Sequence, residues 1–130
     1  MSDAIRVGLV GYGYASKTFH APLISGTPGL ALTTVSSSDA AKVHADWPGA
    51  KVVNAAGELL NDPEIDLVVI ATPNDTHFPL AKAALEAGKH VVVDKPFTVT
   101  LSQARELESL AKHCGRVLSV FHNRPWDSVF

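Results

Sequence analysis

Short apolar runs alternate with helix-like stretches along the whole of this 130-residue chain. The apolar runs are rich in Val, Ile and Leu and are far too short to cross a bilayer, which is typical of strands buried on both faces. They fall at residues 5–10, 30–35, 51–53, 66–71, 90–93 and 117–121. The pattern therefore predicts six strands in a sheet whose two faces are both covered.

The segments between these runs carry helical spacing or helix-terminal signals. A first helix is expected from about Tyr14, kinked or ended near Pro22, because proline lacks a backbone donor. Further helices are expected at 40–46, at 55–60, between Asn74 and Gly88, and from a capping box at Thr100 to Gly115. Strands that alternate with helices predict an α/β Rossmann fold: a doubly wound parallel sheet of order 3-2-1-4-5-6 with helices on both faces.

Composition narrows the class of protein. Hydrophobic residues make up 46% and charged residues 18% of the chain, as in ordinary globular proteins, and the net charge of −2 gives no nucleic-acid-binding surface. The single cysteine, Cys114, excludes an internal disulfide, fits a reducing compartment and is expected to be a buried helix thiol. The histidines lack metal-ligand spacing, and no signal peptide is recognisable. We expect a cytoplasmic protein with no metal, nucleic-acid or membrane partner.

A glycine-rich turn follows the first predicted strand and reads Gly11-Tyr12-Gly13-Tyr14-Ala15-Ser16. The first glycine permits a tight turn, and the second allows the backbone to approach a pyrophosphate at the start of the next helix. The third position of the fingerprint is Ser16 in place of Gly or Ala. The pattern indicates a dinucleotide site. A glycine turn in an unrelated α/β protein and an S-adenosylmethionine loop of a methyltransferase remain alternatives.

Three serines, Ser36, Ser37 and Ser38, follow the second predicted strand, where an NAD-binding domain usually carries an acid for the ribose 2′-hydroxyl. Asp39 comes one or two residues too late for that contact. Without an acid nothing repels a 2′-phosphate, and hydroxyls can donate to it, although no arginine stands among the serines. We expect NADP to be bound at least as well as NAD. The alternative is that the serines merely begin a helix.

Polar residues also follow the fourth and fifth predicted strands. Thr72, Pro73 and Asn74 lead to His77, and Asp94-Lys95-Pro96 follows the valines of the fifth strand. Taken singly, these residues fit a helix N-cap, a surface histidine and a solvated turn. However, open α/β sheets bind ligands beyond the carboxyl ends of their strands, where an ammonium can act on a substrate.

Together these segments resemble the N-terminal half of the Gfo/Idh/MocA oxidoreductases. The resemblance rests on Ala71-Thr72-Pro73-Asn74, His77, Ala87-Gly88-Lys89-His90-Val91 and Asp94-Lys95-Pro96, and it runs from about Ile5 to Asn123. The glycine turn, with Lys17 and Phe19-His20-Ala21-Pro22-Leu23 after it, is most similar to the NADP-linked scyllo-inositol dehydrogenase branch.

The resemblance implies roles for individual residues. Lys95 would be catalytic, beside the nicotinamide and the substrate hydroxyl. The remaining candidates would bind the cofactor: Gly11, Gly13, Tyr14, Ala15 and Ser16 at the phosphates, Ser36, Ser37 and Ser38 at the adenosine ribose, and Thr72, Pro73, Asn74, His77, Asp94 and Asn123 along the rest of the dinucleotide. The chain departs from the family at Asp94, where Glu is usual, and at Pro125, where the branch has Arg.

The resemblance also implies a second domain that supplies the substrate pocket, an acid–base pair and most oligomer contacts. We expect residues 1–122 to form the dinucleotide-binding domain and 123–130 to begin a linker. The parent would be a homo-oligomer that oxidises or reduces secondary alcohols of sugars, inositols or related polyols, while this chain alone binds dinucleotide with little or no turnover. The alternative is a non-catalytic dinucleotide sensor that resembles the galactose-regulon repressor of yeasts.

Overall fold

A computed structural model of the chain describes residues 5–12, 21–71, 77–94 and 100–121. Its strands are β1 (Ile5–Val10), β2 (Leu30–Ser36), β3 (Lys51–Val53), β4 (Leu67–Ile70), β5 (His90–Asp94) and β6 (Leu118–Phe121). Its helices are α1 (Ala21–Gly26), α2 (Ala40–Asp46), α3 (Ala56–Leu60), α4 (His77–Glu86) and α5 (Leu101–Cys114).

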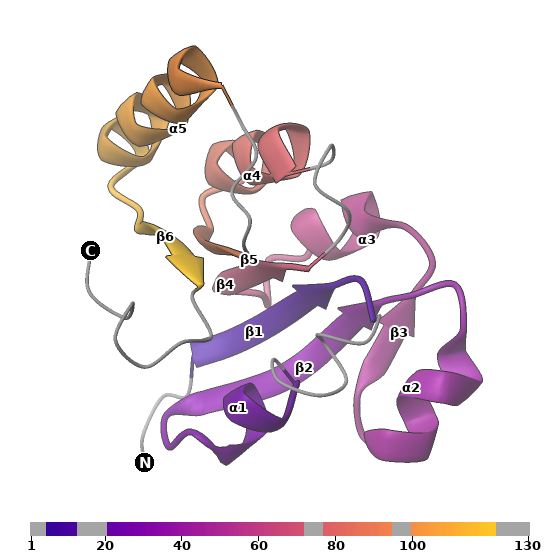
Figure 1. Ribbon diagram of the computed structural model, residues 1–130. Helices are drawn as coiled ribbons and strands as arrows, with labels where there is room; N and C mark the ends of the chain where they lie inside the picture. The colour runs from indigo at the N-terminus through magenta and orange to yellow at the C-terminus, as the bar shows by residue number, and fades with distance from the viewer. Residues whose placement is uncertain (1–4, 13–20, 72–76, 95–99, 122–130) are drawn as a thin grey trace.

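The six strands of the described residues form one parallel sheet of order β3-β2-β1-β4-β5-β6, which confirms the predicted topology (Figure 1). β1 lies at the centre, between β2 and β4. The chain runs from β1 to one edge of the sheet through β2 and β3, and then builds the other half through β4, β5 and β6. The carboxyl ends of β1 and β4 therefore flank the point where the strand order reverses, which is where open α/β sheets bind their ligands.

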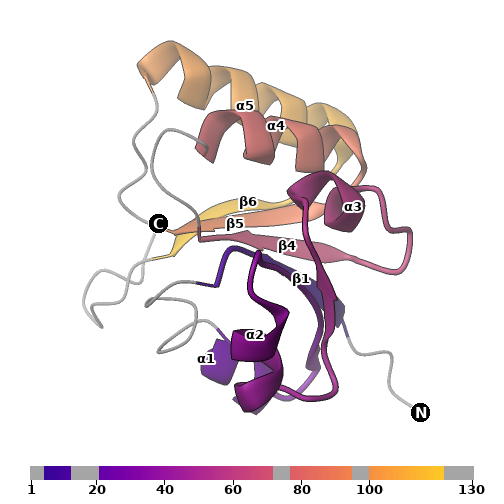
Figure 2. The same cartoon turned by 90° about the vertical axis from the view of Figure 1, so that its right-hand side faces the viewer.

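Helices cover both faces of the sheet, as predicted (Figure 2). Helices α3, α4 and α5 lie on one face and bury residues such as Leu59, Leu85 and Leu107 in a core shared with residues of β1, β4 and β5. Helices α1 and α2 lie on the other face, where Ile24 and Val43 pack with Val7, Leu9 and Val35. This arrangement explains why the strands are apolar throughout and do not alternate.

Local signals in the sequence set the start of α2 and both ends of α5. The Thr100 hydroxyl accepts a hydrogen bond from the Gln103 N–H at 3.1 Å, and the Gln103 side-chain oxygen accepts one from the Thr100 N–H at 3.0 Å, so the expected capping box opens α5. Helix α1 runs on to Gly26, so Pro22 does not end it, because the fixed φ of proline is compatible with helical backbone. The sequence also predicts an apolar stripe along α5, and the stripe is buried at two of its positions, Leu107 and Ala111. Its members are Leu101, Ala104, Leu107, Ala111 and Cys114.

Two residues of that stripe differ from expectation. Leu101 is 68% exposed, because it stands at the first position of α5, before the part of the helix that packs on the core. Cys114 is half-buried, whereas the sequence predicted a buried thiol.

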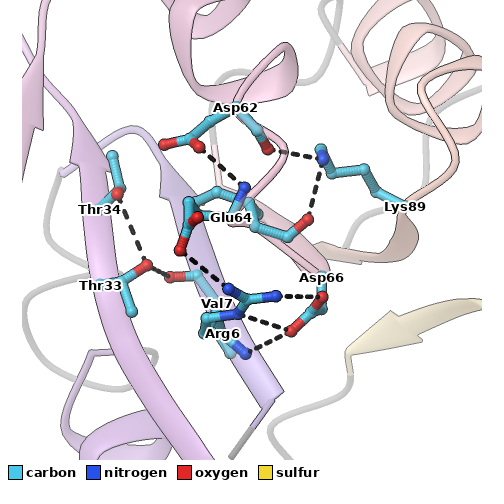
Figure 3. Close-up of polar contacts among 9 residues, drawn as sticks. Arg6, Val7, Thr33, Thr34, Asp62, Glu64, Asp66 and Lys89 are labelled. Atoms are coloured by element: carbon cyan, nitrogen blue, oxygen red, sulfur yellow. Dashed lines mark hydrogen bonds and ion pairs between the residues drawn. The ribbon is translucent and has the colours of Figure 1, made fainter.

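Polar contacts fix the opposite, amino edge of the sheet (Figure 3). The Lys89 side chain is only 5% exposed, and its ammonium donates to the carbonyls of Asp62 and Ile65, both at 2.8 Å. Burial lowers the pKa of Lys89. Arg6 contacts both Glu64 and Asp66, which tie the start of β1 to the segment before β4. Lys89, part of the motif that suggested the family, therefore has a structural role: it links the residue before β5 to the segment before β4.

Candidate functional site

The glycine turn lies at the carboxyl edge of the sheet, where β1 and β2 end. Gly11 has φ of 91°, in the left-handed region that favours glycine, so the expected tight turn is present. The Gly11 N–H donates to the Ser36 carbonyl at 3.0 Å, and the Ala71 N–H donates to the Val10 carbonyl at 3.0 Å. These bonds hold the ends of β1, β2 and β4 side by side.

A pocket of about 520 Å³ lies beyond the ends of β1 and β2. Its wall includes Gly11, Tyr12, the three serines and Lys42. The fold thus brings the start of the glycine turn next to the serine tripeptide, although β2 and α1 separate them in sequence. Asn54 and Leu80 also line the pocket, so the segments after β3 and within α4 contribute to it.

The three serines lie in different environments. Ser36 ends β2 and is 7% exposed. The Ser37 N–H donates to the Val53 carbonyl at 2.9 Å, while the Ser37 hydroxyl accepts from the Asp39 N–H at 3.1 Å. Ser38 is exposed. The residue that caps α2 is Asp39, whose carboxylate accepts from the Lys42 N–H at 3.1 Å. The serines therefore do not provide the N-cap of the helix.

Tyr12, between the two glycines, is held by two hydrogen bonds. Its hydroxyl donates to the Asp46 carboxylate at 2.7 Å and accepts from the indole N–H of Trp47 at 3.0 Å. The side chain is 5% exposed. Burial, and then the bond to Asp46, raise the pKa of Tyr12 to about 12, so the phenol stays neutral at physiological pH.

Lys42 brings a positive charge to the pocket. Its ammonium lies 5.8 Å from the centre of the Tyr12 ring, within the range of a cation–π contact. The side chain is exposed, and among the residues that the structure describes its ammonium forms no ion pair. Our sequence reasoning sought a cation only among the serines and missed both Lys42 and Tyr12. The Lys42 and Asp46 pair, four residues apart on the predicted helix, was the available signal.

Several predicted site residues lie outside the described part of the chain: Gly13, Tyr14, Ala15, Ser16, Thr72, Pro73, Asn74, Lys95 and Asn123. His77 is placed as the first residue of α4 and Asp94 as the last of β5, where it pairs with Phe121. Both therefore stand on elements that end or begin at the carboxyl edge.

Within the described ranges, no helix is long and apolar enough to cross a membrane. The His, Cys, Asp and Glu side chains of the same ranges form no group of three that could hold a metal ion.

A parallel sheet of this order, with a glycine turn after β1 and a pocket beyond the carboxyl ends of β1 and β2, is typical of a dinucleotide-binding domain. The chain belongs to the oxidoreductase family with an NAD-binding Rossmann fold, Gfo/Idh/MocA, whose pattern matches residues 5–122. This finding confirms the family resemblance seen in the sequence.

Individual relatives agree with the family. The chain is 78% identical over 130 residues to the uncharacterized oxidoreductase YdgJ of Escherichia coli, covering all of this chain and 38% of that protein. It is 40% identical over 128 residues to the NADP⁺-linked scyllo-inositol 2-dehydrogenase IolW of Bacillus subtilis, covering 98% and 36%. The solved structure of the Yersinia pestis protein YPO2259 superposes with a TM-score of 0.93 at 72% identity, covering 97% and 36%. The chain thus spans less than two fifths of these relatives.

Proposed function

We propose that this chain is the cofactor domain of an NAD(P)-dependent oxidoreductase that acts on secondary alcohols of sugars, inositols or related polyols. The observation that carries the proposal is the pocket at the carboxyl edge, where Gly11 and the serine tripeptide meet. The left-handed backbone of Gly11, which lines this pocket, fits the tight turn that a dinucleotide site requires. The name of IolW supports an inositol or similar polyol as the substrate class.

The pocket wall favours the 2′-phosphate of NADP. Lys42 supplies a cation, and Ser37 and Ser38 supply hydroxyl groups that can donate to phosphate oxygens. Asp39, a carboxylate that also lines the pocket, already accepts the helix-capping bond from the Lys42 N–H. We therefore assign the adenosine ribose to this pocket and infer that NADP is bound more tightly than NAD.

The chemistry is proposed for the segment after β5. Bound nicotinamide would accept or supply the hydride. Lys95 would orient the reacting hydroxyl and stabilise the negative charge that develops on its oxygen, because an ammonium placed there attracts that charge. Proton transfer would fall to a residue of a second domain after a linker that begins at 123–130, with residues 1–122 as the cofactor domain. In this proposal the parent is a homo-oligomer through that domain.

Calorimetric titration of the chain with NADP⁺ and NAD⁺ tests the cofactor assignment. We expect NADP⁺ to bind more tightly, and Lys42→Gln to weaken NADP⁺ binding about tenfold, the loss typical of one charge-assisted hydrogen bond, with little effect on NAD⁺. Lys51→Gln removes the same charge from the exposed first residue of β3, which does not line the pocket, and is the matched control. A clear preference of the native chain for NAD⁺ would contradict the NADP assignment.

Turnover assays separate the enzyme from the sensor. The chain alone should show little or no oxidation of polyols, and Lys95→Ala in a parent protein that carries the second domain should abolish most of its activity. Full turnover by the chain alone would contradict the two-domain proposal. A parent whose rate is unchanged by Lys95→Ala would contradict the role of the lysine, whereas a parent that binds dinucleotide and turns over no polyol would favour the dinucleotide sensor.

A further inference from the structure

Tyr12 connects two parts of the pocket that come from different βα units. Its backbone belongs to the turn after β1, immediately beside Gly11. Its side chain crosses to α2, the helix that follows β2, and is buried there. The residue is thus placed between the glycine turn, which faces the phosphates, and the helix that carries Lys42.

The contacts of Tyr12 follow one face of α2. Lys42 and Asp46 are four residues apart and therefore lie on the same side of the helix. The ring lies beneath the Lys42 ammonium, and the hydroxyl reaches Asp46 and Trp47 at the carboxyl end of the helix. The two hydrogen bonds fix the position of the hydroxyl, and because the side chain is buried the ring has little space in which to turn. The ring face is therefore a fixed surface for the ammonium.

The fixed ring of Tyr12 restricts where the Lys42 ammonium can lie in the pocket. A lysine side chain has four rotatable bonds, and an exposed ammonium would otherwise sample many positions. Attraction to the electron-rich face of an aromatic ring restricts that sampling. Tyr12 thus holds the ammonium at the pocket wall that includes the serines.

We propose that Tyr12 is a positioning residue for recognition of the 2′-phosphate: held by Asp46 and Trp47, it places Lys42 and so sets the preference for NADP over NAD. It does so without contacting the phosphate itself. The inference rests on the proposed function, since it requires the adenosine ribose to occupy this pocket.

Two adenosine fragments isolate this effect from the rest of the cofactor. Calorimetry on the chain would compare adenosine 2′,5′-bisphosphate with adenosine 5′-monophosphate, which differ only in the 2′-phosphate. Tyr12→Leu, which removes the ring face and the hydroxyl, should weaken binding of the bisphosphate about three- to tenfold more than it weakens binding of the monophosphate. Tyr12→Phe keeps the ring but loses both hydrogen bonds, and should give a smaller loss.

A double-variant cycle makes the readout specific for positioning. If Tyr12 acts through Lys42, then Lys42→Gln with Tyr12→Leu should bind the bisphosphate no worse than Lys42→Gln alone. Additive losses would overturn the inference, as would equal losses for both fragments, because either result assigns Tyr12 only to the shape of the pocket. Should Tyr12→Leu fail to fold, the same cycle with Tyr12→Phe decides.

The results that would contradict the proposed function differ from those that would contradict only the role of Tyr12. If Lys42→Gln leaves the ratio of the bisphosphate and monophosphate affinities at the native value, Lys42 does not recognise the 2′-phosphate. That result would contradict both the cofactor assignment and this inference. If Lys42→Gln abolishes the ratio while Tyr12→Leu and Tyr12→Phe preserve it, the cofactor assignment stands and the role of Tyr12 is refuted.

Discussion

Tyr12 shows how strongly one side chain depends on contacts that no local pattern reveals. By position it belongs to the glycine turn, yet its partners are a carboxylate and an indole more than thirty residues away. Burial and the bond to Asp46 raise its pKa to about 12. The fold therefore favours the protonated phenol more than the unfolded chain does.

Stability should consequently fall as the pH rises from about 10, the usual pKa of tyrosine, toward 12. In that window the unfolded chain releases the Tyr12 proton while the folded chain keeps it. Urea unfolding at a series of alkaline pH values would measure this slope. Tyr12→Phe should remove the part of the slope that belongs to this group, and tyrosinate absorbance should show one late-titrating phenol among the two tyrosines. An unchanged slope in the variant would contradict the prediction.

Residue-scale prediction from sequence succeeded where backbone geometry alone decides. Gly11 was assigned to a tight turn, and its positive φ confirms that. Lys42 was missed because its place in the pocket depends on how α2 packs beside the glycine turn, and this packing is a tertiary contact. Asp39 was judged too late to reach the ribose, and its carboxylate instead caps α2.

At the scale of elements, α3 packs unusually close to β1. A Cβ atom built on Gly8 would lie 2.6 Å from Leu59 Cδ2 and 2.9 Å from Ile65 Cδ1. Leu59 is fully buried and Ile65 is 3% exposed, so neither side chain has free space into which it can move. The absence of a side chain at Gly8 therefore lets this helix approach the sheet.

Gly8→Ala should reduce the free energy of unfolding by about 1–3 kcal/mol through overpacking. Urea denaturation measures the loss. Gly57→Ala, in α3 itself, is the matched control, because nothing lies within 4 Å of its added methyl group; it should instead stabilise by about 0.5–1 kcal/mol. Adding Leu59→Ala to Gly8→Ala should cost less than the sum of the two single changes. Strict additivity would contradict a steric cause.

Most elements could be predicted because their own sequences contain the required signals. Helix α2 and strand β3 have the expected bounds, and the capping box fixed the start of α5. Differences arise where the signal depends on neighbours. Pro22 does not end α1, and β4 is one residue shorter at each end than its apolar run. The pocket could be placed at an edge of the sheet but not outlined, because its walls come from several elements.

On the scale of the whole molecule, a charged contact joins segments that are 60 residues apart. The Arg6 guanidinium and backbone N–H both donate to the Asp66 carboxylate, and these hydrogen bonds lower the pKa of Asp66. Glu64, the other partner of Arg6, is far more exposed. The contact stabilises the central pair of strands at the edge away from the pocket.

Because the folded pKa of Asp66 lies below its unfolded value, its contribution is complete above about pH 4 and is lost as the pH falls through the folded pKa. Asp66→Asn should lower stability at neutral pH and flatten the acid side of the stability profile. Thermal unfolding between neutral and acidic pH would measure both effects. Glu64→Gln is the control and should change the profile little. An equally flat profile in both variants would argue against a specific role of Asp66.

The central position of β1 has a consequence for how the chain is synthesised. Of the six strands that the structure describes, β1 leaves the ribosome before the others, yet it needs partners on both sides, and the second partner, β4, begins only at Leu67. Until that segment emerges, one edge of β1 has no strand to pair with and can pair with another chain. Nascent chains that end before β4 should therefore be the most prone to aggregate, whereas those that end after β5 already contain the complete centre of the sheet.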